Sequence, residues 1–159
     1  MTGLPTVFRP LKAFTWQGIK RWVRRQFPSV QGISTADLSD WLAQKTARPV
    51  LIDARRPAEY AVSHLPNAVQ ANSVEAVEAA GISKNRPVVV YCSVGYRSAR
   101  LGEKLQSAGY PVTNLEGSLF QWANEGRRLE SADGPTRQVH PYSRLWGLLL
   151  DPAVVELAK

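Results

Sequence analysis

The stretch RPVVVYCSVGYRSARLGEKLQSAGY, residues 86–110, predicts a buried strand, a short loop and a helix in immediate succession. Three consecutive valines and Tyr91 form a continuous apolar run, which is typical of a parallel strand covered on both faces. Helical apolar spacing begins after Arg97 and ends at Gly109, a residue type that is common just past a helix C-terminus. Units of strand, loop and helix build parallel α/β sheets.

The flanking segments continue this alternation from Val30 to about Gly126. Upstream, residues 33–45 predict a helix that Ser34 caps and Asp37 supports in a capping box. The next expected elements are a strand in PVLIDA, residues 49–54, where the apolar run stops at Asp53, a short helix from Pro57 and a short strand near Val69. They are followed by a helix over 73–80 that ends at Gly81, a strand over 111–117 and a helix with Leu119 and Trp122. This order predicts an α/β fold with a parallel sheet.

The carboxyl ends of parallel strands lie at one edge of a sheet when the crossovers are right-handed. We therefore expect the loops at 53–56, 92–97 and 115–118 to gather at that edge.

The length and composition predict one globular domain with flanking segments. The chain has 159 residues, of which 44% are hydrophobic and 21% charged, unlike the low hydrophobicity and high charge of disordered proteins. We expect three parts: a basic amphipathic arm over 1–29, the α/β domain over 30–130, and an extension over 131–159. A short apolar helix is expected in that extension, in RLWGLLLDPAVVEL, residues 144–157.

The net charge of +7 comes almost entirely from the arm. Residues 1–27 hold six basic residues and no acidic one, while the rest of the chain is nearly balanced, with 14 basic and 13 acidic residues. The domain surface therefore gives no reason to expect a nucleic-acid partner.

On a helix, the large apolar residues of the arm share one face and its basic residues lie to the sides. The apolar residues are Trp16, Ile19, Val23 and Phe27, and the basic ones are Lys20, Arg21, Arg24 and Arg25. Three arrangements fit this pattern. The arm packs on its own domain, against the apolar C-terminal segment; or residues 8–27 dock to an anionic membrane surface or a partner; or the arm directs the protein to an organelle.

Cysteine and histidine usage limits the chemistry. Cys92 is the single cysteine, so no internal disulfide is expected, and with only His64 and His140 beside it we expect no metal site. No run approaches the roughly 18 apolar residues of a spanning helix, and the N-terminus lacks the apolar core of a secretory signal. We therefore expect a cytoplasmic protein, with peripheral membrane contact through the arm as the open alternative.

Cys92 lies where the buried strand ends and the next helix is about to begin. Unpaired N–H groups and the partial positive charge of a helix N-terminus stabilise an anion such as a thiolate. Arg97 adds a fixed cation, and Gly95 allows the backbone to turn tightly around one sulfur atom. The loop therefore predicts a reactive cysteine. The alternative is a small buried residue at a strand end, with Arg97 in solvent.

Three motifs occur in the order and at the separations of a known family. CSVGYRSA follows VVVY from residue 92, LIDARRPAEYAVSHLPNA occupies residues 51–68, and NLEGSLFQW occupies residues 114–122. Over about residues 31–127 the chain resembles the rhodanese-like domain. The resemblance implies an α/β fold with a central five-stranded parallel sheet and helices on both of its faces.

The resemblance also implies sulfur transfer through a persulfide, without a metal or an organic cofactor. Cys92 is then the catalytic cysteine, and the loop whose backbone N–H groups cradle the persulfide consists of Ser93, Val94, Gly95, Tyr96 and Arg97. The thiolate takes a sulfur from a small-molecule donor such as thiosulfate or a persulfide. It passes this sulfur to a thiol, cyanide or a protein acceptor, which is ping-pong covalent catalysis.

Loop length separates this reaction from phosphate chemistry. Phosphatase and arsenate-reductase relatives place five residues between the cysteine and the arginine, whereas four separate Cys92 from Arg97. A shorter loop fits one sulfur atom better than a tetrahedral oxyanion, so a phosphatase is only the third hypothesis. The second is an interaction or sulfur-carrier module without turnover, docked to a membrane or partner by its arm.

The other motif residues are expected to be mainly structural. Asp53, Arg55 and Glu59 follow a buried strand, where charges are usually paired, and we expect His64 to be a turn residue. Arg56 either attracts anionic donors or is solvated. The chain departs from residues that are frequent in the family at Arg56, Asn67 and Ser118.

Overall fold

The structure, a computed structural model, describes residues 8–155 and contains a five-stranded parallel sheet in the order β1-β5-β4-β2-β3. The strands are β1 (Gly32–Ile33), β2 (Val50–Asp53), β3 (Val69–Gln70), β4 (Val88–Tyr91) and β5 (Val112–Leu115). Every neighbouring pair in this sheet runs parallel. The α/β fold and the five-stranded parallel sheet expected from the sequence are confirmed.

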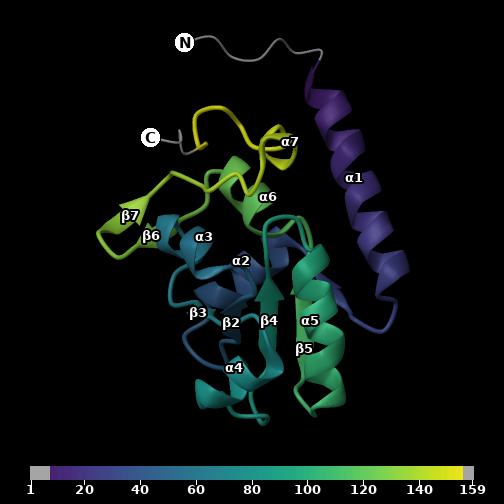
Figure 1. The fold of residues 1–159 in the computed structure, drawn as a ribbon, viewed down its shortest axis with the longest axis vertical. Helices are drawn as coiled ribbons and strands as arrows, with labels where there is room; N and C mark the ends of the chain where they lie inside the picture. Colours follow the sequence, from purple (N-terminus) through teal and green to yellow (C-terminus); the bar gives the residue numbers. More distant parts are fainter. Residues whose placement is uncertain (1–7, 156–159) are drawn as a thin grey trace.

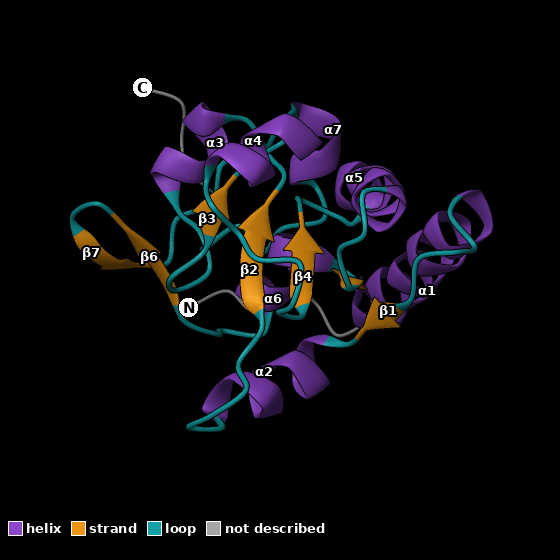
Figure 2. Ribbon diagram, turned by 90° about the horizontal axis from the view of Figure 1, so that it is seen from below, coloured by secondary structure: helices purple, strands orange, loops and turns teal. Residues whose placement is uncertain are grey.

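Helices cover both faces of the sheet, with α2 on one side and α4 and α5 on the other (Figure 2). The helices are α1 (Phe8–Gln26), α2 (Thr35–Ala43), α3 (Pro57–Val62), α4 (Val74–Ala79), α5 (Tyr96–Ser107), α6 (Ser118–Asn124) and α7 (Arg144–Gly147). The expected helix signals are visible: the Ser34 hydroxyl accepts from the Asp37 N–H at 3.0 Å, and Gly109 after α5 has φ +92°. Gly81 likewise has φ +71° after α4.

Side chains of β2 and β4 point alternately into the two halves of the core. Leu51, Val89 and Tyr91 belong to the cluster that includes residues of α2 and α6. Ile52 and Val90 belong to the cluster formed with α4 and α5. Because burying one such aliphatic side chain stabilises a fold by about 1.5–3 kcal/mol, these two central strands anchor the loops at their carboxyl ends.

A small hairpin that the sequence analysis did not predict lies outside the main sheet. It consists of β6 (Leu129–Ser131) and β7 (Gly134–Thr136), which pair antiparallel. Backbone hydrogen bonds of 2.9 and 3.0 Å between His64 and Glu130 fasten it beside α3. Figure 2 shows it to the side of β3, the edge strand of the main sheet.

Helix α1 lies alongside the domain, next to α5 (Figure 1). Val23 and Phe27 are buried in a cluster with Ala99 of α5, while Trp16 joins the main core. Arg24 also donates two hydrogen bonds of 2.6 Å to the Glu116 carboxylate. Of the three arrangements considered for the arm, the structure therefore has the helix packed on its own domain. Residues 1–7 of the expected arm lie outside the described residues.

The C-terminal segment contains a much shorter helix than the apolar stretch over 144–157 suggested. Helix α7 ends at Gly147, a poor helix former, and Pro152 disfavours helical backbone at the residue before it. Leu150 and Val154 are nevertheless buried in the same hydrophobic cluster as Trp16, so the segment and the arm contribute to one core. Residues 156–159 lie outside the described part. Within residues 8–155, no helix is long and apolar enough to cross a membrane.

Candidate active site

The loop from Cys92 to Arg97 connects the carboxyl end of β4 to the first turn of α5, as the sequence predicts. Gly95 has φ +112°, a left-handed conformation that favours glycine and turns the chain sharply. This turn directs the Gly95 N–H at the Cys92 sulfur, with 3.2 Å between N and Sγ. The Cys92 sulfur is therefore held by a backbone amide beside a helix N-terminus, where an anion is stabilised.

The side chain of Ser98, in the first turn of α5, lies behind the cysteine. Its Oγ is 3.4 Å from Cys92 Sγ and 2.6 Å from Asn114 Oδ1. A hydroxyl carries one proton, so Ser98 donates to either the sulfur or the amide oxygen at a given moment. Asn114 in turn donates to the Gly95 carbonyl at 3.0 Å. Sequence reasoning missed both residues, although Ser98 follows directly on the loop.

Ser118 fixes the start of the loop from the neighbouring strand end. Its Oγ accepts from the Cys92 N–H at 3.2 Å and donates to the Leu115 carbonyl at 2.8 Å. Ser118 has φ +48° and Asn67 has φ +61°, both in the left-handed region that favours glycine. The N–H groups of Leu119 and Phe120 then bind the carbonyls of Cys92 and Ser93, each at 3.0 Å.

The expected gathering of the three loops is thus present. The N–H of Ala54 donates to the Tyr91 carbonyl at 2.8 Å, which joins the loop after β2 to the end of β4. Together with the contacts of Ser118, this places residues 53–56, 92–97 and 115–118 at one edge of the sheet.

Arg97 is oriented by a carboxylate from α3. Two hydrogen bonds of 2.9 Å join its guanidinium to Glu59, and a third of 2.9 Å joins it to the Ser93 hydroxyl. The Glu59 side chain is fully buried. Burial opposes its ionisation, but the hydrogen bonds and charge of Arg97, together with two hydrogen bonds from Arg56, outweigh burial and lower the pKa of Glu59 to about 2. Glu59 is therefore an ionised partner of the loop, which sequence reasoning did not foresee.

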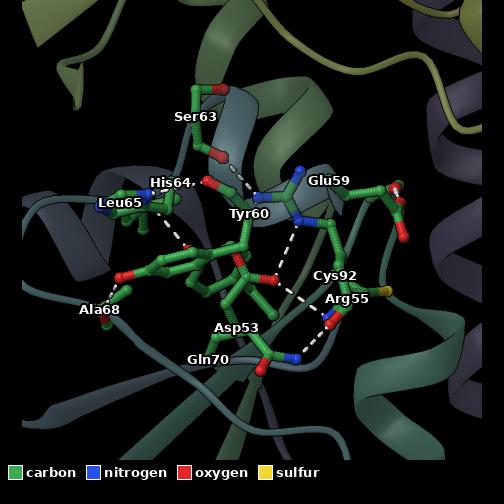
Figure 3. Close-up of polar contacts among 12 residues, drawn as sticks. Asp53, Arg55, Glu59, Tyr60, Ser63, His64, Leu65, Ala68, Gln70 and Cys92 are labelled. Carbon is green, nitrogen blue, oxygen red and sulfur yellow. Dashed lines mark hydrogen bonds and ion pairs between the residues drawn. The ribbon is translucent and has the colours of Figure 1, made fainter. Parts of the chain in front are cut away.

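Asp53 and Arg55 form a separate, fully buried ion pair. Arg55 Nε and Nη2 donate to the two Asp53 oxygens at 2.9 and 2.7 Å, and Nη2 also donates to the Ser63 carbonyl at 2.6 Å. Figure 3 shows these bonds around the Arg55 side chain, together with the Gln70 amide that donates to the Arg55 carbonyl. None of them involves the cysteine loop.

His64 is placed as a turn residue and not as an acid or base for Cys92. Its ring stacks on Tyr60 with 3.8 Å between the ring centroids, and its Nδ1 is 3.0 Å from the Tyr60 carbonyl oxygen. Figure 3 shows the pair on the opposite side of Arg55 from the Cys92 sulfur.

A cavity of about 120 Å³ opens on the cysteine loop. Its lining residues are Trp22, Cys92, Ser93, Val94, Tyr96, Arg97, Tyr142 and Trp146. The structure therefore brings all six predicted site residues together. Gly95 is the one that lies behind the others, where its N–H contacts the sulfur.

Three aromatic walls of this cavity come from segments on either side of the α/β domain. Trp22 of α1 stacks on Tyr96, with 4.8 Å between ring centroids. Tyr142 lies over the Arg97 guanidinium at 4.5 Å, and Trp146 of α7 completes the wall. Sequence reasoning missed these three residues because no local pattern links them to a cysteine about fifty or more residues away. The described residues include no group of three His, Cys, Asp or Glu side chains that could hold a metal ion.

Comparisons with known proteins agree with this geometry. The profile of the rhodanese-like domain matches residues 34–125, more than half of the chain. A sulfurtransferase of Allochromatium vinosum is 36% identical over 107 residues, covering 66% of this chain and 99% of its own length. A thiosulfate:glutathione sulfurtransferase of Saccharomyces cerevisiae is 25% identical over 126 residues, covering 70% of this chain and 90% of its own.

The fold also occurs in solved structures. The crystal structure of a thiosulfate sulfurtransferase from Pseudomonas aeruginosa superposes with a TM-score of 0.60 at 25% identity. The superposition covers 88% of this chain and 26% of the other, so the chain corresponds to about a quarter of that enzyme.

Proposed function

This chain belongs to the rhodanese-like domain family, and we propose that it is a sulfurtransferase that carries a sulfane sulfur as a persulfide on Cys92. The observation that supports this most directly is the hydrogen bond of 3.2 Å from the Gly95 N–H to the Sγ of the buried Cys92, a residue that lines the cavity. An amide N–H in this position stabilises an anionic sulfur but does not protonate it, so the sulfur stays nucleophilic. The cavity leaves room for the second sulfur atom that Cys92 acquires.

In the first half-reaction, the donor is thiosulfate or a small persulfide. The Cys92 thiolate forms a bond to the outer sulfur of thiosulfate while the bond between the two donor sulfurs breaks. Sulfite leaves with that electron pair, so the negative charge of the thiolate passes to the new persulfide. Arg97 lines the cavity and supplies the positive charge beside which the anionic donor and the leaving sulfite lie.

In the second half-reaction, an outside acceptor removes the sulfur. The chain has one cysteine, so no second thiol of the same chain can resolve the persulfide. The acceptor is therefore a small thiol, cyanide or a protein thiol. A cytoplasmic setting suits this chemistry because reducing compartments keep a lone thiol available.

Intact-mass analysis tests the proposal. We expect incubation with thiosulfate to add the mass of one sulfur atom to the protein and later addition of cyanide to remove it with release of thiocyanate. Failure to gain sulfur from thiosulfate, thiosulfonates and small persulfides alike would contradict the proposal. Hydrolysis of an aryl phosphate at a comparable rate would favour the phosphatase hypothesis instead.

A second candidate function, peripheral contact with an anionic membrane, is supported by exposed apolar residues in α1 and in the segment of α7 and Leu148. Phe14, Leu145 and Leu148 are large apolar residues with exposures of 84%, 72% and 72%. The exposed Arg21 and Arg25 of α1 provide the basic side chains that accompany such anchors.

For this candidate, we expect the full chain to float with vesicles that contain phosphatidylserine. With vesicles of pure phosphatidylcholine, we expect it to remain unbound at the bottom of the gradient. Changing Leu145 and Leu148 to serine should weaken flotation because both contribute apolar area that only a membrane would bury. Protein that stays at the bottom of the gradient with both kinds of vesicle would contradict the proposed membrane contact.

A further inference from the structure

A second hollow adjoins the cysteine cavity, on the side of α5. It has a volume of about 410 Å³, and it shares Tyr96, Arg97 and Tyr142 with the cysteine cavity. Four of its lining residues are cations, namely Arg56, Arg97, Arg100 and Lys104, whereas no aspartate or glutamate lines it. We call it the basic hollow. Its size lies in the range of about 300–1,000 Å³ that is usual for small-molecule sites.

The positive charge of the basic hollow is only partly neutralised. Glu59 pairs with Arg97 at 2.9 Å and with Arg56 at 3.2 Å, so one carboxylate serves two of the four cations. Arg100 and Lys104 are exposed, and no ion pair of either is found within residues 8–155. The hollow therefore carries a surplus of positive charge next to the cysteine.

The cations also follow one line away from the loop. Arg97, Arg100 and Lys104 are spaced by three and four residues on α5, so they lie on one helix face over roughly 10 Å. Tyr142 lines both spaces at the near end, where its ring lies 4.5 Å from the Arg97 guanidinium carbon and 5.2 Å from that of Arg56. A ligand that reaches the cysteine past Tyr142 thus meets cations along its length.

We propose that the basic hollow binds the body of the sulfur acceptor, and that this acceptor is a small thiol with two or more carboxylates remote from its sulfur. The inference rests on the proposed function. The cysteine cavity, at about 120 Å³, admits the sulfur-bearing end of such a molecule but not its whole body. The remainder extends into the adjoining hollow, where several cations around one concave space attract an anion more strongly than isolated surface charges do.

Before the transfer step, the outer sulfur of the anionic Cys92 persulfide takes up one proton from solvent. The acceptor thiolate then forms a bond to this protonated outer sulfur. The bond between that sulfur and Cys92 Sγ breaks, and its electron pair stays on Sγ. The products are the acceptor persulfide, which keeps the proton, and the Cys92 thiolate, so charge is conserved and no further oxidant or reductant is needed.

A binding experiment tests the inference independently of sulfur transfer. S-methylglutathione has two carboxylates and no free thiol, and its diethyl ester has the same skeleton without those charges. We expect calorimetry to show that the unmodified protein binds S-methylglutathione about tenfold more tightly than the ester, and that added salt reduces the difference. Changing Arg100 and Lys104 together to glutamine should remove most of this preference.

A matched control uses another basic hollow of the same protein. Arg86 and Arg128 line a hollow of about 610 Å³ beside the start of β2, at the opposite end of the strands from Cys92. Changing both to glutamine removes the same charge, yet it should leave the preference intact. Equal binding of the acid and the ester, or loss of the preference in this control variant, would overturn the inference.

Single-turnover kinetics then separate the inference from the proposed function. With the persulfide form, the ratio of rate constants for glutathione and its diethyl ester should fall about tenfold in the Arg100→Gln, Lys104→Gln variant. An unchanged ratio would contradict the inference while leaving persulfide chemistry standing. Tight binding of S-methylglutathione by a protein that never acquires sulfur would support the hollow and reject the enzyme.

Discussion

Changing Cys92 to alanine should abolish sulfur uptake from thiosulfate and reduce thiocyanate formation by about 10³-fold or more, to the uncatalysed level. No other side chain of the chain can replace it, because the sequence has a single cysteine. Intact mass and a cyanolysis assay measure the two effects on the same samples.

Changing Cys92 to serine is the matched control, since a hydroxyl keeps the small size and can still accept the Gly95 N–H. The serine variant should be as inactive as the alanine variant, and its thermal midpoint should stay close to that of the natural chain. Substantial turnover in either variant would show that the persulfide does not form on this residue.

The largest effect on stability is expected at Arg55. Its guanidinium and the Asp53 carboxylate are both completely buried. Changing Arg55 to leucine leaves the carboxylate buried without its counter-ion, and removing one partner of such a pair typically costs about 3–5 kcal/mol. Urea unfolding followed by tryptophan fluorescence measures this loss in the free energy of unfolding.

Two further variants serve as controls for the Arg55→Leu result. Changing Asp53 and Arg55 together to asparagine and leucine should recover part of the stability, because the uncompensated charge is removed as well. Changing the exposed Arg86 to leucine should alter the free energy of unfolding by no more than about 0.5 kcal/mol. A loss below about 1 kcal/mol in the Arg55→Leu variant would mean that the pair is solvated in solution.

The sheet could be predicted because its central strands have a local, unambiguous composition. The consecutive valines of β4 and the VLID stretch of β2 are short apolar runs rich in β-branched residues, which is typical of a strand covered on both faces. The hairpin of β6 and β7 could not be predicted in this way, because both strands have only three residues and β7 consists of glycine, proline and threonine, so neither strand has such a pattern. Its position depends on backbone bonds to His64, which only the folded chain brings near.

The site residues fall into the same two groups: those that follow a local sequence pattern and those whose contacts depend on the folded chain. The six residues from Cys92 to Arg97 were predictable because the strand, the glycine turn and the helix start are contiguous in sequence. Glu59 was expected only to be structural, since sequence does not show which cation a buried acid will meet. The contacts of Asn114 and Ser118 depend on β5 lying beside β4, a relationship that the parallel topology implies but does not resolve to single atoms.

Tryptophans from both flanks of the α/β domain meet above one sulfur atom, Trp22 before it and Trp146 after it. Part of the wall past which a ligand approaches the sulfur therefore belongs to segments outside the loop that holds it. Mutations in these two flanks can alter which donors and acceptors fit, in addition to changes among the cations of α5, while the chemistry at the cysteine is inherited unchanged.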